Sequence, residues 1–120
     1  MVNHMPNPTQ HGHAIKTIDG LALNIHHNAL AHGWWDTPRN DGEAIALMHS
    51  ELSEALEGLR QGNPPSDKIP NFTALEEELA DVVIRIMDFS AGRGLRLGGA
   101  IMAKHNYNTT RPFKHGGKAF

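Results

Sequence analysis

The chain has 120 residues, 39% of them hydrophobic, which is the length of one domain and enough apolar residues for its core. It has no cysteine, so disulfide scaffolds, zinc–thiolate sites and cysteine nucleophiles are excluded. Its formal net charge of -2 argues against a generally basic surface for a nucleic-acid polymer. No apolar run has the length of a membrane span, so no membrane association is expected.

The N-terminal stretch carries neither an export signal nor a helical pattern. Its sequence, MVNHMPNPTQHGH, lacks the basic and apolar regions of a signal peptide. We therefore expect a cytoplasmic protein. Because residues 1–16 are rich in Pro, Asn and His without an apolar period, they are predicted to form a flexible N-terminal arm.

Apolar residues at helical spacing predict three long helices. These begin near Ile18, Asn40 and Thr73 and end near Gly33, Gly62 and the pair Gly92 and Gly94. Asn40 and Thr73 are each followed three residues later by a glutamate, which is the form of an N-terminal cap. Between the second and third helices, three prolines in the segment QGNPPSDKIP predict a loop.

A shorter fourth helix is predicted from about Leu97 to Tyr107. The Pro- and Gly-containing residues 111–120 are expected to form an extended C-terminal tail that could act as a lid. Residues 17–110 then make up one helical domain. The predicted fold is an all-α bundle of about four helices, completed by oligomerisation because its apolar surface is wide for so small a unit.

Two pairs of acidic residues stand out on consecutive predicted helices. Glu51 and Glu54 lie three residues apart on one helix, as do Glu78 and Asp81 on the next. Residues at this spacing share a helix face. Because both pairs fall on the same flank of their apolar stripes, antiparallel packing of the two helices would bring all four carboxylates together.

Converging carboxylates repel one another and need compensation. Some could be protonated, Arg85 and nearby lysines could neutralise them, or divalent cations could bind among them. A thiolate-free set of oxygen ligands favours hard cations, Mg²⁺ first and Mn²⁺ next. The alternative interpretation is that the acids form ordinary solvated helix faces.

A basic strip is predicted on the fourth helix, where Lys104, Asn108 and Arg111 follow at i, i+4 and i+7. If the helix continues to Pro112, they share one face and suit phosphate oxygens. The alternative is a solvated basic helix end, favoured by the helix dipole.

The adjacent Trp34 and Trp35 are candidates for stacking on a nucleobase, with Asn28 as a polar neighbour. The alternatives are that the Trp pair closes a core or an oligomer interface and that Asn28 is simply exposed. A broad stacking platform slightly favours purine bases over pyrimidines.

The motifs HSELSEALEGLR, EEELADVVIRIMD and AKHNYNTTRPFKHGGK, between Gly42 and Lys118, resemble the MazG-like all-α nucleoside triphosphate pyrophosphatases. These enzymes cleave between the α and β phosphates and release a nucleoside monophosphate and pyrophosphate. One departure is visible, because Ser50 stands where the family's first motif often has an additional glutamate.

The resemblance implies that the four acidic residues bind Mg²⁺ and that the basic strip holds the triphosphate. A carboxylate, Glu54 first and Glu51 next, would orient or deprotonate the attacking water. A (d)NTP such as dGTP or dATP is the expected substrate, and a homodimer or homotetramer is the expected assembly, with the tail acting in cis or in trans. The alternatives are hydrolysis of a nucleoside diphosphate or alarmone, and a non-enzymatic oligomeric interaction module.

Overall fold

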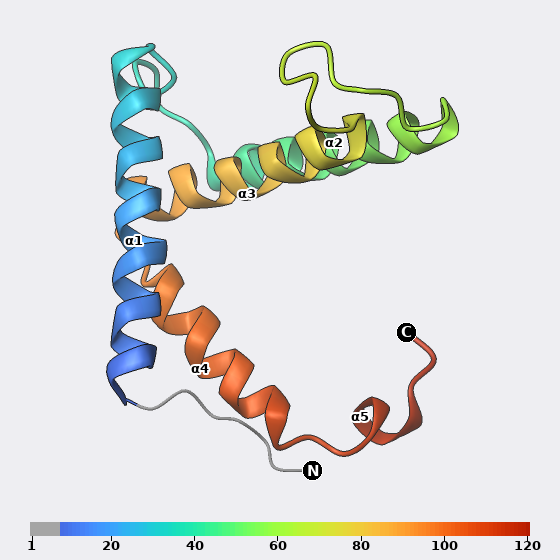
Figure 1. The fold of residues 1–120 in the computed structure, drawn as a ribbon. Coiled ribbons are helices and arrows are strands. Elements are labelled where there is room, and N and C mark those ends of the chain that lie inside the picture. Colours follow the sequence, from blue (N-terminus) through green and yellow to red (C-terminus); the bar gives the residue numbers. More distant parts are fainter. Residues whose placement is uncertain (1–7) are drawn as a thin grey trace.

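A computed structural model describes residues 8–120 of the chain. This range is all-α, which confirms the predicted fold class. It contains four long helices, followed by one short helix near the C-terminus (Figure 1). The helices are α1 (Pro8–Ala31), α2 (Asp41–Arg60), α3 (Ala74–Gly92), α4 (Leu97–Thr109) and α5 (Lys114–Gly117). Among the described residues, no helix has both the length and the apolar character needed to cross a membrane.

The predicted caps set the starts of α2 and α3. The Asn40 side chain accepts hydrogen bonds from two backbone amides of the first turn of α2. Thr73 and Glu76 form a reciprocal capping box at the start of α3. Gly33 and Gly62 follow the ends of α1 and α2, and both have φ of 84°. Glycine adopts this left-handed conformation without strain, so each of them helps to end its helix.

Two predicted boundaries at the ends of the chain are wrong. Residues 8–16, expected to belong to a flexible arm, form the first turns of α1, and residues 1–7 lie outside the described range. Proline is well suited to the first position of a helix, and the helix is held further along by contacts with α4. In the tail, expected to be extended throughout, residues Lys114–Gly117 form the short helix α5.

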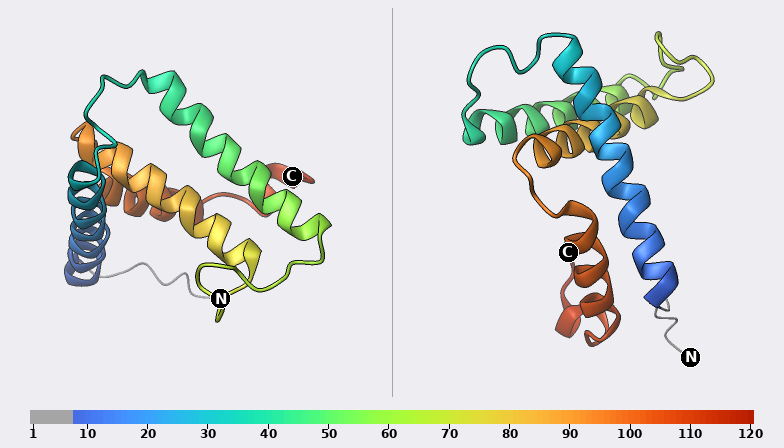
Figure 2. Two further views of the ribbon diagram at one scale, coloured as in Figure 1. Left: turned by 90° about the horizontal axis from the view of Figure 1, so that it is seen from above. Right: turned by 90° about the vertical axis from the view of Figure 1, so that its left-hand side faces the viewer.

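The four long helices form two arms that meet where α1 crosses α3. Helices α2 and α3 run side by side as one arm, and α4 lies along the N-terminal half of α1 as the other (Figures 1 and 2). The radius of gyration is 17.0 Å, against about 14 Å for a compact domain of this length. The bundle is therefore open in a single chain.

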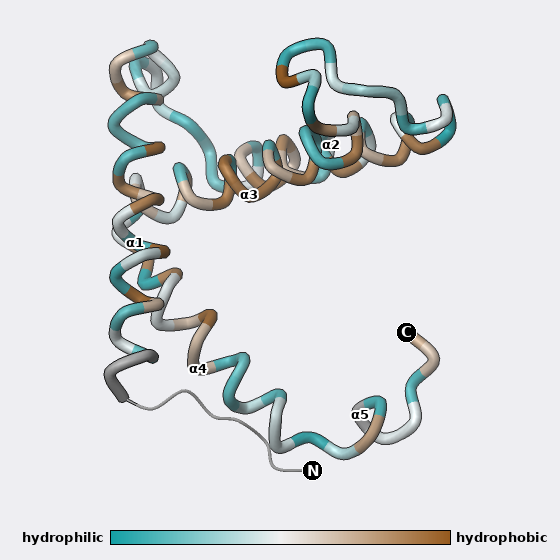
Figure 3. Tube along the Cα trace, viewed as in Figure 1, coloured by the Kyte–Doolittle hydropathy of each residue, from teal (hydrophilic) through white to brown (hydrophobic). Residues whose placement is uncertain are grey.

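The apolar core is small for the number of apolar residues in the chain. Among the described side chains, no large one is fully buried, and the buried apolar residues are four alanines and two methionines. Apolar residues recur along α2 and α3 (Figure 3), and many of their side chains remain exposed. They include Ile45, Leu52, Leu56, Leu59, Leu79 and Val83. In other proteins, exposed apolar patches of this kind are often interaction surfaces.

A close backbone contact joins α1 to α4. The Asp19 carboxylate accepts a hydrogen bond of 2.8 Å from the Gly98 amide in the first turn of α4. A Cβ atom at Gly98 would lie 2.7 Å from that carboxylate and 2.9 Å from the Ile15 carbonyl oxygen. The absence of a side chain at this position therefore allows the two helices to approach.

We expect Gly98→Ala to lower the free energy of unfolding by about 1–3 kcal/mol, because the added methyl group would push the backbone of α1 away. The matched control is Gly99→Ala, since a Cβ at Gly99 meets nothing within 4 Å and alanine favours a helix. Urea denaturation followed by circular dichroism measures both. Equal stabilities of the two variants would contradict this account of the joint.

Candidate metal centre

Three of the four predicted carboxylates converge between α2 and α3. Glu51 reaches across from α2, and Glu78 and Asp81 project from α3, so that one oxygen of each lies within 4.8 Å of the others. All three side chains are partly buried. The expected antiparallel pairing of the two helices therefore brings together an all-oxygen group that could hold a metal ion.

Glu54 does not belong to this group. It is exposed on α2 and is absent from the set of carboxylates that lie close enough to share an ion. A separation of three residues rotates a side chain about 60° around the helix axis. Helix α3 presents both members of its pair to the cluster, whereas α2 presents only Glu51, and so the prediction that all four carboxylates converge is wrong.

The cluster strongly disfavours full ionisation. Burial, a hydrogen bond with Glu51 and the negative charge of Asp81 raise the pKa of Glu78 from 4.5 to about 7. Burial and the charges of Glu51 and Glu77 also raise the pKa of Asp81. In the absence of a cation, a proton on Glu78 therefore relieves part of the repulsion.

Two basic side chains offset the remaining charge. Both Nε and Nη2 of Arg85 lie 2.8 Å from one carboxylate oxygen of Glu51, as expected if Arg85 neutralises the acids. Lys68 and Arg85 each act to lower the pKa of Asp81. The cluster nevertheless keeps more carboxylates than close counter-charges, which suits a hard divalent cation with oxygen ligands.

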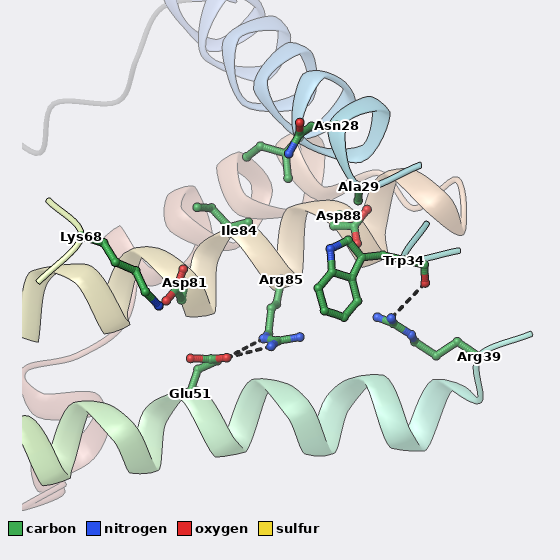
Figure 4. A pocket seen from close by; sticks show the side chains of 11 residues that line it. Asn28, Ala29, Trp34, Arg39, Glu51, Lys68, Asp81, Ile84, Arg85 and Asp88 are labelled. Atoms are coloured by element: carbon green, nitrogen blue, oxygen red, sulfur yellow. Dashed lines mark hydrogen bonds and ion pairs between the residues drawn. The ribbon is translucent and has the colours of Figure 1, made fainter. Parts of the chain in front are cut away.

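A cavity of about 350 Å³ opens beside the cluster, between α1, α3 and the chain that joins α1 to α2 (Figure 4). Its polar and charged lining residues come from both arms and from the loop between α2 and α3. They are Asn28, Arg39, Glu51, Lys68, Asp81, Arg85 and Asp88. This volume suits a small-molecule ligand rather than a polymer.

The two tryptophans have different roles, although they are adjacent in the sequence. Trp34 is 60% exposed and lines the cavity together with Asn28, so both remain candidates for contact with a base. Trp35 does not line the cavity; its indole nitrogen donates to both carboxylate oxygens of Asp88, at 2.9 and 3.1 Å. The prediction that Trp35 stacks on a base is therefore not supported.

Trp35 instead joins α1 to α3. His26 lies 2.8 Å from the same carboxylate and packs edge-on against the Trp35 ring at 5.0 Å between centroids. A Cβ at Gly92 would lie 2.4 Å from the indole, so glycine is needed for this packing. The partly buried Trp35 side chain therefore has a structural role at the contact between α1 and α3.

The predicted basic strip does not reach the carboxylates within one chain. Helix α4 ends at Thr109, so Arg111 lies beyond it, although Lys104 and Arg111 both contact the Tyr107 ring. Lys104 and Asn108 line a separate shallow depression on α4. Helix α4, which carries Lys104 and Asn108, extends away from α2 and α3 (Figure 1).

Three residues of the site escaped sequence reasoning. Asp88 follows Asp81 by seven residues, a spacing that puts both on one helix face and could have revealed it. Glu77 precedes Glu78 in a run of three glutamates and adds its negative charge to the cluster. Lys68 lies in an irregular loop, where no periodicity indicates which way a side chain points.

Comparison with family models, with curated proteins and with solved structures gives no match for this chain. Its function is therefore argued from its own motifs and geometry.

The raised pKa of Glu78 predicts that the free energy of unfolding depends on pH. The folded chain holds a proton that the unfolded chain releases above pH 4.5, so this stabilisation is complete below pH 4.5 and is lost as the pH rises through about 7. We expect the melting temperature without divalent cations to fall between pH 5 and 8. Glu78→Gln should reduce this fall and be more stable than the unmodified chain at pH 8.

The control is Glu57→Gln, which neutralises an exposed glutamate on α2 and should leave the pH profile unchanged. Melting curves at half-unit pH intervals measure all three proteins. Parallel profiles for the chain and Glu78→Gln would contradict the cluster electrostatics.

Proposed function

We propose that the chain is a Mg²⁺-dependent nucleoside triphosphate pyrophosphohydrolase of the MazG-like type. The observation that carries this proposal is the convergence of Glu51, Glu78 and Asp81 within 4.8 Å at the wall of a cavity of about 350 Å³. The same residues belong to the two acidic motifs that resemble the family. A polyanionic substrate fits this place only together with cations, which the carboxylates would hold.

Glu51, Glu78 and Asp81 are the proposed ligands of Mg²⁺, with Mn²⁺ as a substitute. When bound, the metal supplies charge neutralisation at the phosphates and a water of lowered pKa. Metal binding requires ionised ligands, so Glu78 must lose its proton, and metal affinity should rise with pH near 7. Arg85 holds Glu51 at 2.8 Å and thereby fixes the side chain that comes from the opposite helix.

The reaction is hydrolysis at the α-phosphorus. A water oxygen forms a new bond to phosphorus, the bond to the bridging oxygen of the β phosphate breaks, and pyrophosphate leaves. A carboxylate accepts the proton of the water. Glu51 lies in the cluster and Glu54 one turn further along α2, so the two remain the proposed residues for this role, and replacement of each tests it.

Trp34 and Asn28 form the proposed base subsite. Both line the cavity that also contains Asp81, so a nucleotide with its phosphates at the carboxylates would extend its base towards them. The large indole face favours a purine such as the base of dGTP or dATP. Trp35 is left out of this subsite, since its indole nitrogen is bound to Asp88.

We propose further that the chain works as a homodimer or a dimer-based tetramer. The exposed leucines and isoleucine of α2, with Leu79 and Val83 of α3, are the apolar side chains that a second copy would cover. A second copy could also bring the basic strip of its α4, with Lys104, to the cavity. This would reconcile the predicted role of the strip with its position on the other arm.

The first prediction of the proposal concerns turnover. We expect Mg²⁺-dependent pyrophosphate release from one or a few of eight ribo- and deoxyribonucleoside triphosphates, with activity retained in Mn²⁺ and abolished by chelator. Glu51→Gln and Asp81→Asn should lower kcat by about a hundredfold or more, since each removes a charge that holds the metal. Glu57→Gln is the matched control and should behave like the unmodified chain.

Other outcomes would favour the alternatives. Release of inorganic phosphate instead of pyrophosphate, or turnover confined to diphosphates or alarmones, would indicate a different nucleotide hydrolase. A folded oligomer without any metal-dependent turnover would favour the interaction module, which the exposed apolar face also supports.

The second prediction concerns assembly. Light scattering should give a dimer or tetramer mass, and Leu56→Glu should dissociate it, because Leu56 is 50% exposed on the apolar face of α2. Ser53→Glu adds the same charge at an exposed position of α2 and is the control. A monomer at micromolar concentration would contradict the proposed assembly.

Sharing of sites can be tested by mixing two inactive variants. If Lys104 acts in trans, a mixture of Glu51→Gln and Lys104→Ala should regain part of the activity, since some sites would then receive both intact residues. No recovery after subunit exchange would exclude the trans arrangement.

A further inference from the structure

Lys68 lies in the loop between α2 and α3, and its side chain lines the cavity beside Asp81 (Figure 4). Its ammonium group lies next to the Asp81 carboxylate, at the end of the cavity away from Trp34 (Figure 4). None of the sequence motifs contains this residue. Because Lys68 lies in a loop, its position depends on how that loop is folded.

The loop is fixed by Ser66. The hydroxyl of this buried residue, 4% exposed, accepts hydrogen bonds from the backbone amides of Lys68 and Ile69, at 3.2 and 3.1 Å. The same hydroxyl donates to the carboxylate of Glu77, the residue before Glu78 on α3. The Ser66 amide donates to the Phe72 carbonyl at 2.8 Å, so the loop is closed upon itself and attached to the helix that carries the cluster.

The three basic residues that line the cavity differ in how they are engaged. Arg85 pairs with Glu51 at 2.8 Å, and Arg39 donates to the Trp34 carbonyl at 3.0 Å. Within residues 8–120, the ammonium group of Lys68 makes neither a hydrogen bond nor an ion pair, although it lies near enough to Asp81 to act on its charge. All the donors of this ammonium group are thus available to a ligand, whereas Arg39 and Arg85 each already use part of their guanidinium.

We propose that Lys68 binds phosphate oxygens of the substrate, and specifically those of the β and γ phosphates that leave as pyrophosphate. A lysine ammonium is a compact point charge suited to phosphate, and here its backbone is fixed beside the proposed metal ligands. This inference rests on the proposed function. Lys68 would make, within a single chain, the phosphate contact that the basic strip of α4 does not make at the cavity.

The test measures binding of inorganic pyrophosphate in the presence of Mg²⁺ by calorimetry. We expect Lys68→Ala to weaken this binding by about ten- to a hundredfold, and Lys68→Arg to retain part of it. Because residue 68 is exposed, the variants should fold normally, which circular dichroism verifies. Binding of Mg²⁺ alone should not weaken in Lys68→Ala, since removal of a cation does not remove a ligand.

The matched control is Lys16→Ala, which removes the same charge from an exposed position of α1. It lies twelve residues before Asn28 on that helix, a separation of about 18 Å. This control should bind pyrophosphate like the unmodified chain. In steady-state assays, Lys68→Ala should raise KM and weaken product inhibition by pyrophosphate, whereas Lys16→Ala should change neither.

The outcomes separate the two proposals. If the unmodified chain hydrolyses a triphosphate and Lys68→Ala matches it in KM and pyrophosphate affinity, the role of Lys68 is refuted while the proposed function stands. If no triphosphate is hydrolysed but pyrophosphate binding depends on Lys68, the phosphate site stands and the proposed reaction fails. If the unmodified chain does not bind pyrophosphate, or if Lys16→Ala loses as much affinity as Lys68→Ala, the inference is overturned.

Discussion

The enforced proximity of like charges between α2 and α3 is the constraint on which the candidate site depends. Two unit charges about 5 Å apart at an effective dielectric of 20 repel by roughly 3 kcal/mol, and here three carboxylates share such a space. Helix packing and a shared proton keep them together, and Arg85 compensates part of their charge. The same repulsion that destabilises the cation-free chain would be released on binding of a divalent cation, so the cost in folding is linked directly to ligand affinity.

Local chemistry made much of the fold predictable. The Asn40 and Thr73 caps act within one helical turn, so the starts of α2 and α3 follow from a few neighbouring residues. The i, i+3 spacing likewise predicted a common face for the acids. It could not show that α3 would present both of its acids to the cluster and α2 only Glu51, because that outcome depends on the rotation of each helix about its own axis at the contact.

Features that depend on contacts between distant residues could not be predicted from the spacing of residues along the sequence. The direction of α4 depends on the approach of its first turn to Asp19 and the Ile15 carbonyl, a contact between residues about eighty positions apart. Helical spacing therefore aligned Lys104 with Asn108 but did not reveal that α4 leads away from the acids. The position of Lys68 likewise depends on Ser66, whose hydroxyl links the loop to α3, and no periodic pattern marks such a link.

The His26, Trp35 and Asp88 contacts have a consequence for specificity. They join the helix that carries Asn28 to the helix that carries Asp81, so they determine the span between the proposed base subsite and the carboxylates. Under the proposed function, this span would set the length of nucleotide that can reach both ends. Ligand selection in such a site would be governed as much by the rigidity of this joint as by the groups that touch the ligand.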